Sequence, residues 1–209
     1  MFNAGSLTFH EFAMNEPLPL AVLQDAVLDF LRGRDDAVVF GAQAVNAYVA
    51  EPRMSQDIDL LSTRAAELAE ELRAFLSERF HIAVRIREVA DGRGCRLYQA
   101  RKSGNRYLVD IRLAQTLPPA RRIAEVLVAS PEQLVALKVI AYHQRRGQPK
   151  SGTDWRDLAM LLLAFPELKQ NAGLVADRLH AESAGDEILN LWHEVVAQEI
   201  QTTDEDDEF

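Results

Sequence analysis

The pattern of apolar and polar positions changes character along the chain. Residues 18–34 carry apolar side chains at helical spacing, and residues 64–80 are rich in Ala, Leu and Glu, which favour helix. Short apolar or alternating runs typical of strands lie between and after them: 37–40, 56–61, 81–89, 95–100 and 106–113. From residue 131 almost to the end the pattern is helical. The sequence therefore predicts an α/β part followed by a helical part.

Turn-forming and capping residues indicate how these elements are joined. The stretch Asp91-Gly92-Arg93-Gly94 predicts a hairpin between two antiparallel strands. Glu51-Pro52 ends a short helix over 42–50, because proline disfavours helical backbone in the residue before it. Three hydroxyl residues stand where helices should begin and are predicted as N-caps: Thr63, Ser130 and Thr153. The predicted fold class is α/β (α+β), a mixed sheet with flanking helices plus a C-terminal helical bundle.

Charge and boundary signals divide the 209 residues into three regions. We predict the α/β part over 1–129, the helical part over 130–202 and an acidic tail over 203–209. The formal net charge is −9, and five of the acids are consecutive at 204–208, so the chain without them carries −4. An acidic end of this kind is typical of a solvated, disordered segment. The alternative is a segment that contacts a partner or masks the protein's own basic groups.

The cysteine content and the hydropathy of the chain indicate the cellular compartment in which the protein is expected. Cys95 is the single cysteine, so no intrachain disulfide can form and a reducing compartment is favoured. No apolar run reaches the roughly 18 residues that span a bilayer, and the N-terminus lacks the pattern of a signal peptide. We therefore expect a cytoplasmic protein with no membrane partner.

Two acidic residues follow a glycine turn at the centre of the α/β part. The strand 37–40 ends at Gly41, a short helix follows, and the strand 56–61 then carries Asp57 and Asp59. Strand side chains alternate between faces, so these two carboxylates point the same way. Such like charges repel unless a cation lies between them, and carboxylate oxygens suit Mg²⁺. The Gly41-Ala42 turn before the helix offers backbone N–H groups to phosphate.

A third acidic residue, Asp110, lies within the apolar strand 106–113. A carboxylate in such a strand is costly to bury unless it is paired or bound to metal. Two interpretations follow. Asp110 joins Asp57 and Asp59 in one site, which we favour, or it pairs with Arg112 or another cation at a sheet edge.

These residues resemble the nucleotidyltransferase signature of the DNA polymerase beta-like superfamily. The stretch Arg53-Met54-Ser55-Gln56-Asp57-Ile58-Asp59 is most similar to the abortive-infection (AbiEii-like) nucleotidyltransferase toxins of bacterial type IV toxin–antitoxin systems. The resemblance is strongest over 35–61 and returns over 107–163. The family usually has Gly-Gly or Gly-Ser at the turn, whereas Ala42 of this chain keeps the backbone amide but lacks the serine hydroxyl.

The resemblance implies a nucleotidyltransferase-like mixed sheet and an Mg²⁺-dependent transfer of a nucleoside monophosphate from an NTP. The acceptor would be an RNA, such as tRNA, or a protein hydroxyl. It implies that Asp57, Asp59 and Asp110 are catalytic and bind the metal. The groups expected to contact the nucleotide are Gly41, Ala42, Arg53, Ser55, Lys138, Arg145 and Lys150. A toxin role and a cognate antitoxin, as a separate partner protein, are implied by the family.

Other interpretations stay open at the level of sequence. Lys138 lies among apolar neighbours, which favours a functional role, but it can instead pair with Asp157, while Arg145 complements a helix C-terminus. For the whole chain, the alternative is a catalytically degraded relative that binds a nucleotide or a partner. A third interpretation treats Asp57-Ile58-Asp59 as a solvated strand end.

Overall fold

The computed structural model describes residues 18–89, 91–102 and 104–201. By its internal contacts the chain divides into unit 1, Met1–Ser130, and unit 2, Pro131–Phe209. The predicted acidic tail at 203–209 lies outside the described residues.

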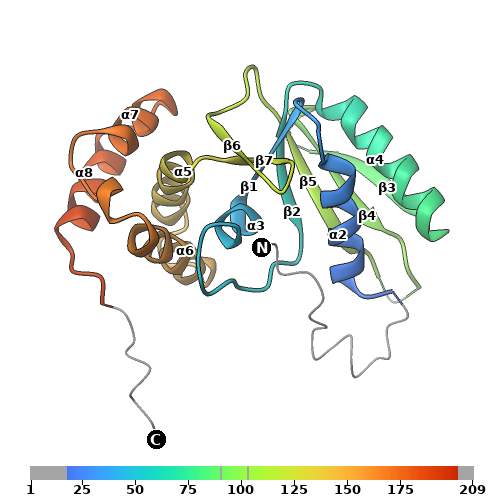
Figure 1. Ribbon diagram of the computed structural model, residues 1–209, viewed down its shortest axis with the longest axis horizontal. Helices are drawn as coiled ribbons and strands as arrows, with labels where there is room; N and C mark the ends of the chain where they lie inside the picture. Colours follow the sequence, from blue (N-terminus) through green and yellow to red (C-terminus); the bar gives the residue numbers. More distant parts are fainter. Residues whose placement is uncertain (1–17, 90, 103, 202–209) are drawn as a thin grey trace, which may run out of the picture. The chain divides into compact units, whose positions relative to one another are not determined.

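The described residues of unit 1 form a seven-stranded mixed sheet in the order β3-β4-β5-β2-β1-β7-β6 (Figure 1). The strands are β1 (Ala37–Phe40), β2 (Ile58–Ser62), β3 (Val84–Val89), β4 (Gly94–Gln99), β5 (Arg106–Leu113), β6 (Ala120–Ile123) and β7 (Val126–Ala129). β2 is parallel to β5 and β1 is parallel to β7, whereas the other neighbours are antiparallel. The predicted mixed sheet, with a meander beside the acidic strand, is confirmed.

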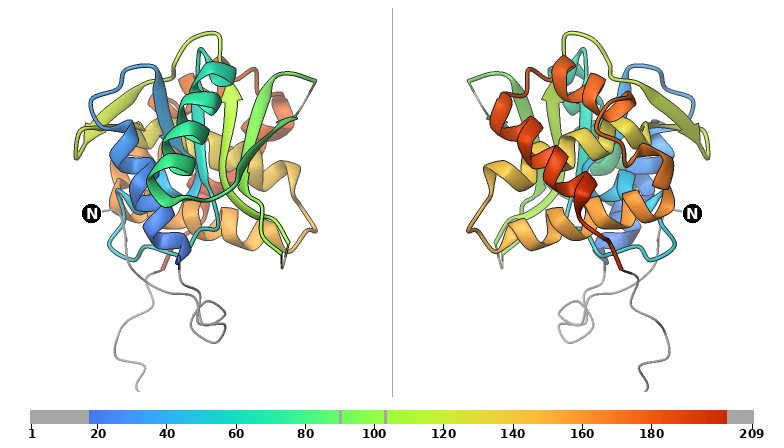
Figure 2. Two further views of the ribbon diagram at one scale, coloured as in Figure 1. Left: turned by 90° about the vertical axis from the view of Figure 1, so that its right-hand side faces the viewer. Right: turned by 90° about the vertical axis from the view of Figure 1, so that its left-hand side faces the viewer.

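Two helices cover one face of this sheet. Helix α2 (Leu20–Leu31) packs beside α4 (Ala65–Phe80), and both lie in front of the strands in the left view of Figure 2. They bury leucines such as Leu23, Leu68 and Leu72 completely, together with Ile58 and Leu60 of β2. Burial of this apolar surface is the main stabilising term of the fold. Because side chains alternate along β2, Asp59 and Leu61 point to the opposite face.

The short helix α3 (Gly41–Asn46) follows β1 and contacts β1 and β2. It is shorter than the predicted helix over 42–50, because the chain turns back after Asn46. The Asn46 side-chain amide donates to Arg53 O at 2.7 Å, and the Arg53 N–H donates to Asn46 Oδ1 at 3.0 Å. This pair of hydrogen bonds holds the loop that leads into β2.

All three predicted side-chain caps are wrong. Helix α4 begins at Ala65 after Arg64, whose backbone N–H is bonded by Ser62 Oγ at 3.1 Å, so Thr63 is not the cap. Within the described residues Ser130 Oγ is buried without a hydrogen-bond partner, although the next helix does begin at Pro131. Thr153 lies inside its helix and donates to Lys150 O at 2.7 Å.

Unit 2 is helical, as predicted. Its described elements are α5 (Pro131–Gln144), α6 (Lys150–Ala164), a 3₁₀ turn η1 (Pro166–Leu168), α7 (Leu174–Ala181) and α8 (Asp186–Ala197). Trp192 is completely buried and donates its indole N–H to Gln170 O at 3.1 Å, so it is a core residue. Among the described residues, no helix has the length and apolar character needed to cross a bilayer.

Candidate active site

Strand pairing brings two of the predicted acids together. In the parallel pair β2–β5, Asp59 lies opposite Asp110, and Asp59 also lies opposite Phe40 in the antiparallel pair β1–β2. Residues opposite each other point to the same face, so both carboxylates project from the face that α2 and α4 do not cover. Asp110 is buried and Asp59 is half-buried. β5 is an internal strand of the sheet, so Asp110 is not at a sheet edge.

Asp57 lies just outside the strand in which it was expected. β2 begins at Ile58, and Asp57 occupies the bend before it, with Ser55 Oγ donating to Asp57 O at 2.9 Å. The expected placement within a strand over 56–61 is therefore wrong for this residue, because pairing with β5 starts at Ile58. Within the described residues the half-buried Asp57 carboxylate makes no hydrogen bond or ion pair.

Gly41 is required where it stands by the closeness of Asp59. It has a φ of +70°, and a Cβ built on it would lie 2.0 Å from Asp59 Oδ2. Only glycine combines that left-handed backbone with so close an approach. The Gly41-Ala42 backbone thus crowds directly against one of the site carboxylates, and Ala42 is buried at the start of α3.

Arg96 of β4 is a member of this cluster that sequence reasoning missed. It lies opposite Asp110 in the β4–β5 pair and donates from Nη2 to Asp110 Oδ2 at 2.7 Å. The bond to Asp110 raises the pKa of the Arg96 guanidinium, and the nearby charge of Asp57 contributes. Arg96 also lies over the Tyr107 ring, 5.3 Å from its centroid. The sequence left open that Asp110 pairs with Arg112 or another basic side chain. Asp110 does form such an ion pair, with Arg96.

Two other missed residues fix the loop that carries Arg53, Ser55 and Asp57. Besides Asn46, the Gln24 side chain of α2 donates to Ser55 O at 2.9 Å. Gln24 in turn accepts from Gln43 at 3.3 Å. Side-chain amides that bond to loop backbone leave no periodic signal in a sequence, although the two buried amides Gln43 and Asn46 within the motif region are a hint. The Arg53 side chain donates to Met54 O at 3.2 Å.

Two of the three predicted basic residues of unit 2, Lys138 and Arg145, form a cluster with two aspartates. Lys138 on α5 is buried and donates to Asp157 Oδ2 at 2.6 Å and to Asp154 Oδ1 at 3.4 Å. Arg145 donates to Asp154 Oδ2 at 2.6 Å. The Lys138–Asp157 ion pair is the contact expected if Lys138 stabilises the fold rather than binding a ligand. Lys150 is exposed at the first position of α6.

The donor chemistry of the unit 1 cluster fits a hard divalent cation. Asp57, Asp59 and Asp110 supply only carboxylate oxygens, which Mg²⁺ prefers. Across the part of the chain that the structure describes, no three His, Cys, Asp or Glu side chains are grouped tightly enough to hold a metal by themselves. Arg96 occupies one oxygen of Asp110, so a cation and this guanidinium would compete for that carboxylate.

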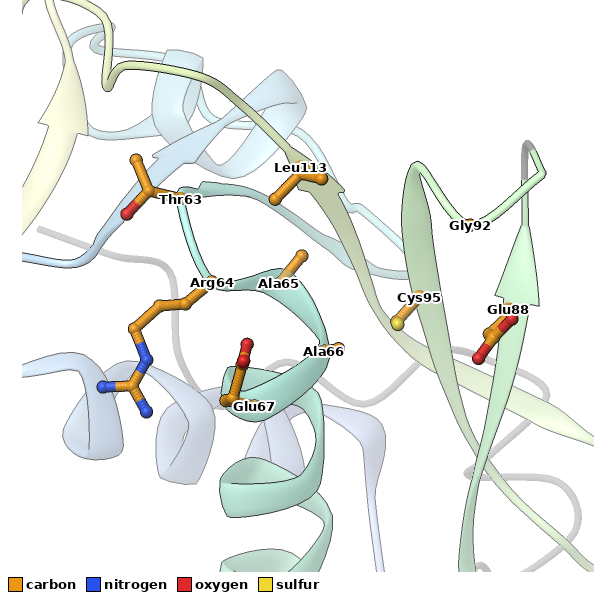
Figure 3. Close-up of a pocket in the computed structure, with 9 residues that line it drawn as sticks. All are labelled: Thr63, Arg64, Ala65, Ala66, Glu67, Glu88, Gly92, Cys95 and Leu113. Atoms are coloured by element: carbon orange, nitrogen blue, oxygen red, sulfur yellow. The ribbon is translucent and has the colours of Figure 1, made fainter.

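A separate cavity of about 330 Å³ opens at the other end of β2 and β5 (Figure 3). It is lined by the start of α4, the β3–β4 turn, Cys95 and Leu113, and it contains none of the predicted site residues. Burial raises the pKa of the Cys95 thiol, with help from the charges of Glu88 and Glu70, which keeps it protonated and unreactive.

Comparisons with known proteins identify the family and the fold. The family model described as nucleotidyl transferase AbiEii toxin, type IV TA system, matches residues 23–207. Among solved structures, a polyadenylate synthase from Megavirus is similar with a TM-score of 0.61 and 15% identity, over 75% of this chain and 34% of that chain. JHP933 from Helicobacter pylori is similar with a TM-score of 0.57 and 16% identity, over 92% of each chain. At these identities the structural likeness shows the fold alone. Among curated proteins, none matches the sequence.

Proposed function

From the premise that this chain belongs to the AbiEii family of nucleotidyltransferases, we propose that it uses Asp57, Asp59 and Asp110 with Mg²⁺ to transfer a nucleoside monophosphate. The donor is an NTP, and the acceptor is a hydroxyl of an RNA, such as tRNA, or of a protein. The family makes the chain an enzyme of nucleotidyl transfer, while the metal, the residues and the acceptor are our proposal.

One observation carries the assignment of the residues. Asp59 is opposite Asp110 on neighbouring parallel strands, and the Gly41 backbone lies so close to Asp59 that no side chain fits between them. Two acids brought together on one face and a left-handed glycine pressed against one of them are costly features. A binding site for a cation and for phosphate gives both features a reason.

The residues would divide the work as follows. Asp57, Asp59 and Asp110 would hold Mg²⁺, which neutralises charge on the triphosphate as pyrophosphate leaves. The backbone amides of Gly41 and Ala42 would bind the terminal phosphates. Asp110 would accept the proton of the attacking hydroxyl.

Arg53 and Ser55 lie in the loop held by Asn46 and Gln24, which supports a fixed contact with the nucleotide rather than a mobile one. Lys138, Arg145 and Lys150 of unit 2 are proposed to contact phosphates. For Lys138 that role competes with its bond to Asp157.

In the cell we propose that the protein acts as the toxin of a type IV toxin–antitoxin or abortive-infection pair, with a separate antitoxin as its partner. This role rests on the family alone. The second candidate, a non-catalytic relative that binds nucleotide, is favoured by Ala42 at the turn and by Arg96 on Asp110.

A labelling experiment separates the two. The purified protein is mixed with Mg²⁺, each α-labelled NTP in turn, and either bulk tRNA or a cell protein extract. Asp57→Asn is the test variant, because it removes one charge with little change of shape. Asp91→Asn is its matched control, since Asp91 is an exposed turn residue at φ 53°, a conformation that Asn tolerates.

We expect label on an acceptor with the wild type and with Asp91→Asn, and a loss of at least about 100-fold, or ~2.7 kcal/mol, with Asp57→Asn. Undiminished transfer by Asp57→Asn contradicts the assignment of this residue. Binding of NTP with Mg²⁺ but no transfer by the wild type favours the non-catalytic candidate.

A further inference from the structure

A row of side chains crosses the sheet in register and ends at the candidate site. Arg87 of β3 lies opposite Arg96 of β4, Arg96 opposite Asp110, and Asp110 opposite Asp59. Residues paired in this way point to one face of the sheet. At about 4.8 Å per strand, the row from Arg87 to Asp59 covers roughly 14 Å. Two arginines therefore lead from the sheet edge to the acids.

A β-bulge adds two tyrosines to the same face. The β4–β5 register shifts after Leu97, so that Tyr98 lies opposite Tyr107 and the pairing skips Leu108. This extra residue turns Tyr107 to the side of Tyr98 and Arg96. The two rings meet edge to face with centroids 6.4 Å apart. Tyr107 is 45% exposed, which is unusual for a large aromatic side chain.

Basic charge is concentrated in this part of the chain. Residues 84–113 hold eight basic residues and three acidic ones, a local net charge of +5 in a chain of −9. On the face itself, Arg85 lies opposite Tyr98, beside Arg87. Both arginines are exposed on the edge strand β3, and among the described residues neither takes part in an ion pair. Their charges are thus available to an external anion.

We propose that this arginine–tyrosine face, made of Arg85, Arg87, Arg96, Tyr98 and Tyr107, binds a single-stranded nucleic acid as the acceptor. The inference rests on the proposed function, because it assigns the acceptor class of that same site. Phosphates pair with the arginines, a base stacks on Tyr107, and the strand end reaches Asp110 and Asp59.

The combination of groups selects this ligand over a protein. Exposed arginines beside two tyrosine rings on a sheet surface match a chain of phosphates and flat bases. Arg85 and Arg87 are exposed on the same face as Tyr107, and phosphates together with a base use both kinds of group, which a protein hydroxyl acceptor does not need. A duplex keeps its bases stacked inside and cannot offer one to Tyr107, so a single strand is required.

The test measures binding without chemistry. A fluorescein-labelled single-stranded RNA of 20 adenosines is titrated with the full-length protein at several salt concentrations, followed by anisotropy. Single-stranded DNA and duplex RNA of the same length are titrated in separate experiments, which show whether the face prefers RNA, DNA or a duplex. The variants are Arg85→Ala/Arg87→Ala and Tyr107→Ala. The control is Arg32→Ala/Arg73→Ala, since Arg32 at the C-cap of α2 and Arg73 on α4 belong to the helices that cover the other face and make only local ion pairs with Asp29 and Glu70.

We expect the double variant to reduce the slope of log K against log salt by about 1.4, because two phosphate contacts are lost. Tyr107→Ala should weaken binding about tenfold, and the control should bind as the wild type does. A wild type that prefers the duplex, or that binds no nucleic acid, overturns the proposal. Unchanged binding by both variants overturns it as well.

A parallel measurement keeps this proposal distinct from the proposed function. Mg²⁺-dependent binding of NTP is followed by calorimetry in the same proteins, and it should be unaffected by the Arg85 and Arg87 substitutions. NTP binding with transfer to protein, but not to a single strand, refutes the acceptor alone. Tight single-strand binding without any transfer refutes the proposed function and leaves the face as a nucleic-acid site.

Discussion

The two units each contain a cluster of aspartates and basic side chains, and the clusters differ in how their charges are satisfied. In unit 2, Asp154 and Asp157 are 2% and 1% exposed, and each accepts from Lys138, with Arg145 on Asp154 as well. In unit 1, Asp57 and Asp59 are half-buried, and Asp57 has no ion-pair partner within the described residues. Arg96 holds Asp110.

We propose that this difference separates charges that stabilise the fold from charges that bind a ligand. A buried charge with internal partners is stable only while those partners remain. A half-exposed acid beside other acids gains from an external cation. We therefore expect substitutions in unit 2 to act on stability and those in unit 1 to act on binding and catalysis.

The largest effect on stability is expected for Lys138→Met. It leaves Asp154 without one partner and Asp157 without its closest one, both in a buried environment. The free energy of unfolding should fall by about 3–5 kcal/mol, measured by urea denaturation. Lys150→Met, at an exposed position, should change it by less than about 0.5 kcal/mol. A loss below about 1 kcal/mol for Lys138→Met would show that the pair is not structural and would strengthen its role as a phosphate contact.

Gly41→Ala tests whether backbone crowding, rather than ion pairing, positions the unit 1 acids. The methyl group would meet Asp59 Oδ2 at 2.0 Å, and the backbone has a φ of +70°. We expect a stability loss of about 2–3 kcal/mol and loss of transfer, because Asp59 must move. Gly33→Ala is the matched control, since Gly33 has a φ of +71° with nothing within 4 Å. It should show only the backbone cost, about 1–2 kcal/mol, with transfer retained.

Arg96→Gln tests whether the Arg96 guanidinium competes with Mg²⁺ for the Asp110 carboxylate. Removing the charge bonded to Asp110 should lower the Mg²⁺ concentration needed for half-maximal thermal stabilisation by about 3–10-fold, since two cations no longer compete. Without Mg²⁺ the free energy of unfolding should fall by about 1–3 kcal/mol, because the buried Asp110 carboxylate loses its charged partner, although Arg96 itself is 38% exposed. An unchanged Mg²⁺ dependence would contradict a role for Asp110 in metal binding.

The sequence was sufficient for the local parts of this picture. β1 and β5 run over the predicted residues, because apolar strands bounded by Gly41 on one side and by a turn on the other have little freedom. The grouping of Asp59 with Asp110 was expected from an acid within an apolar strand together with the family resemblance. The boundaries of the short helix and of the acidic strand were less accurate, since side chains such as Asn46 decide them through tertiary contacts.

Long-range register accounts for what sequence reasoning missed. The partner of Asp110 depends on how β4 pairs with β5, and the bulge at Leu108 shifts that pairing by one residue. A shift of one residue moves every following side chain to the other face of the sheet. Neither the Arg96–Asp110 bond nor the Tyr98–Tyr107 contact could be predicted from periodicity alone.

The smallest effect on stability is expected at a third ion cluster, formed by Arg34, Asp36 and Glu71. Its side chains are ion-paired like those of unit 2 but partly exposed like those of the unit 1 site. Arg34 donates to Asp36 at 2.7 and 2.9 Å and to Glu71 at 2.8 Å. The bond to Arg34 lowers the pKa of Asp36 below its ordinary value of 3.8, while that bond raises the pKa of Arg34. Because the pKa of Asp36 is lower in the folded state, its contribution is present above about pH 4 and is lost as the pH falls through the folded-state pKa.

Asp36→Asn should therefore lower the free energy of unfolding by up to about 1 kcal/mol at pH 7, and the difference from the wild type should shrink as the pH falls from 4 towards 2. Urea denaturation at several pH values measures this. Asp35→Asn is the neighbouring control and should cost less, because the Asp35 side chain is 81% exposed and solvent screens its pair with Arg122. A loss that persists unchanged at pH 2 would mean that packing, not charge, stabilises Asp36. The ranking of the three clusters would then depend on burial alone, and the unpaired carboxylate of Asp57 among the described residues would no longer support cation binding there.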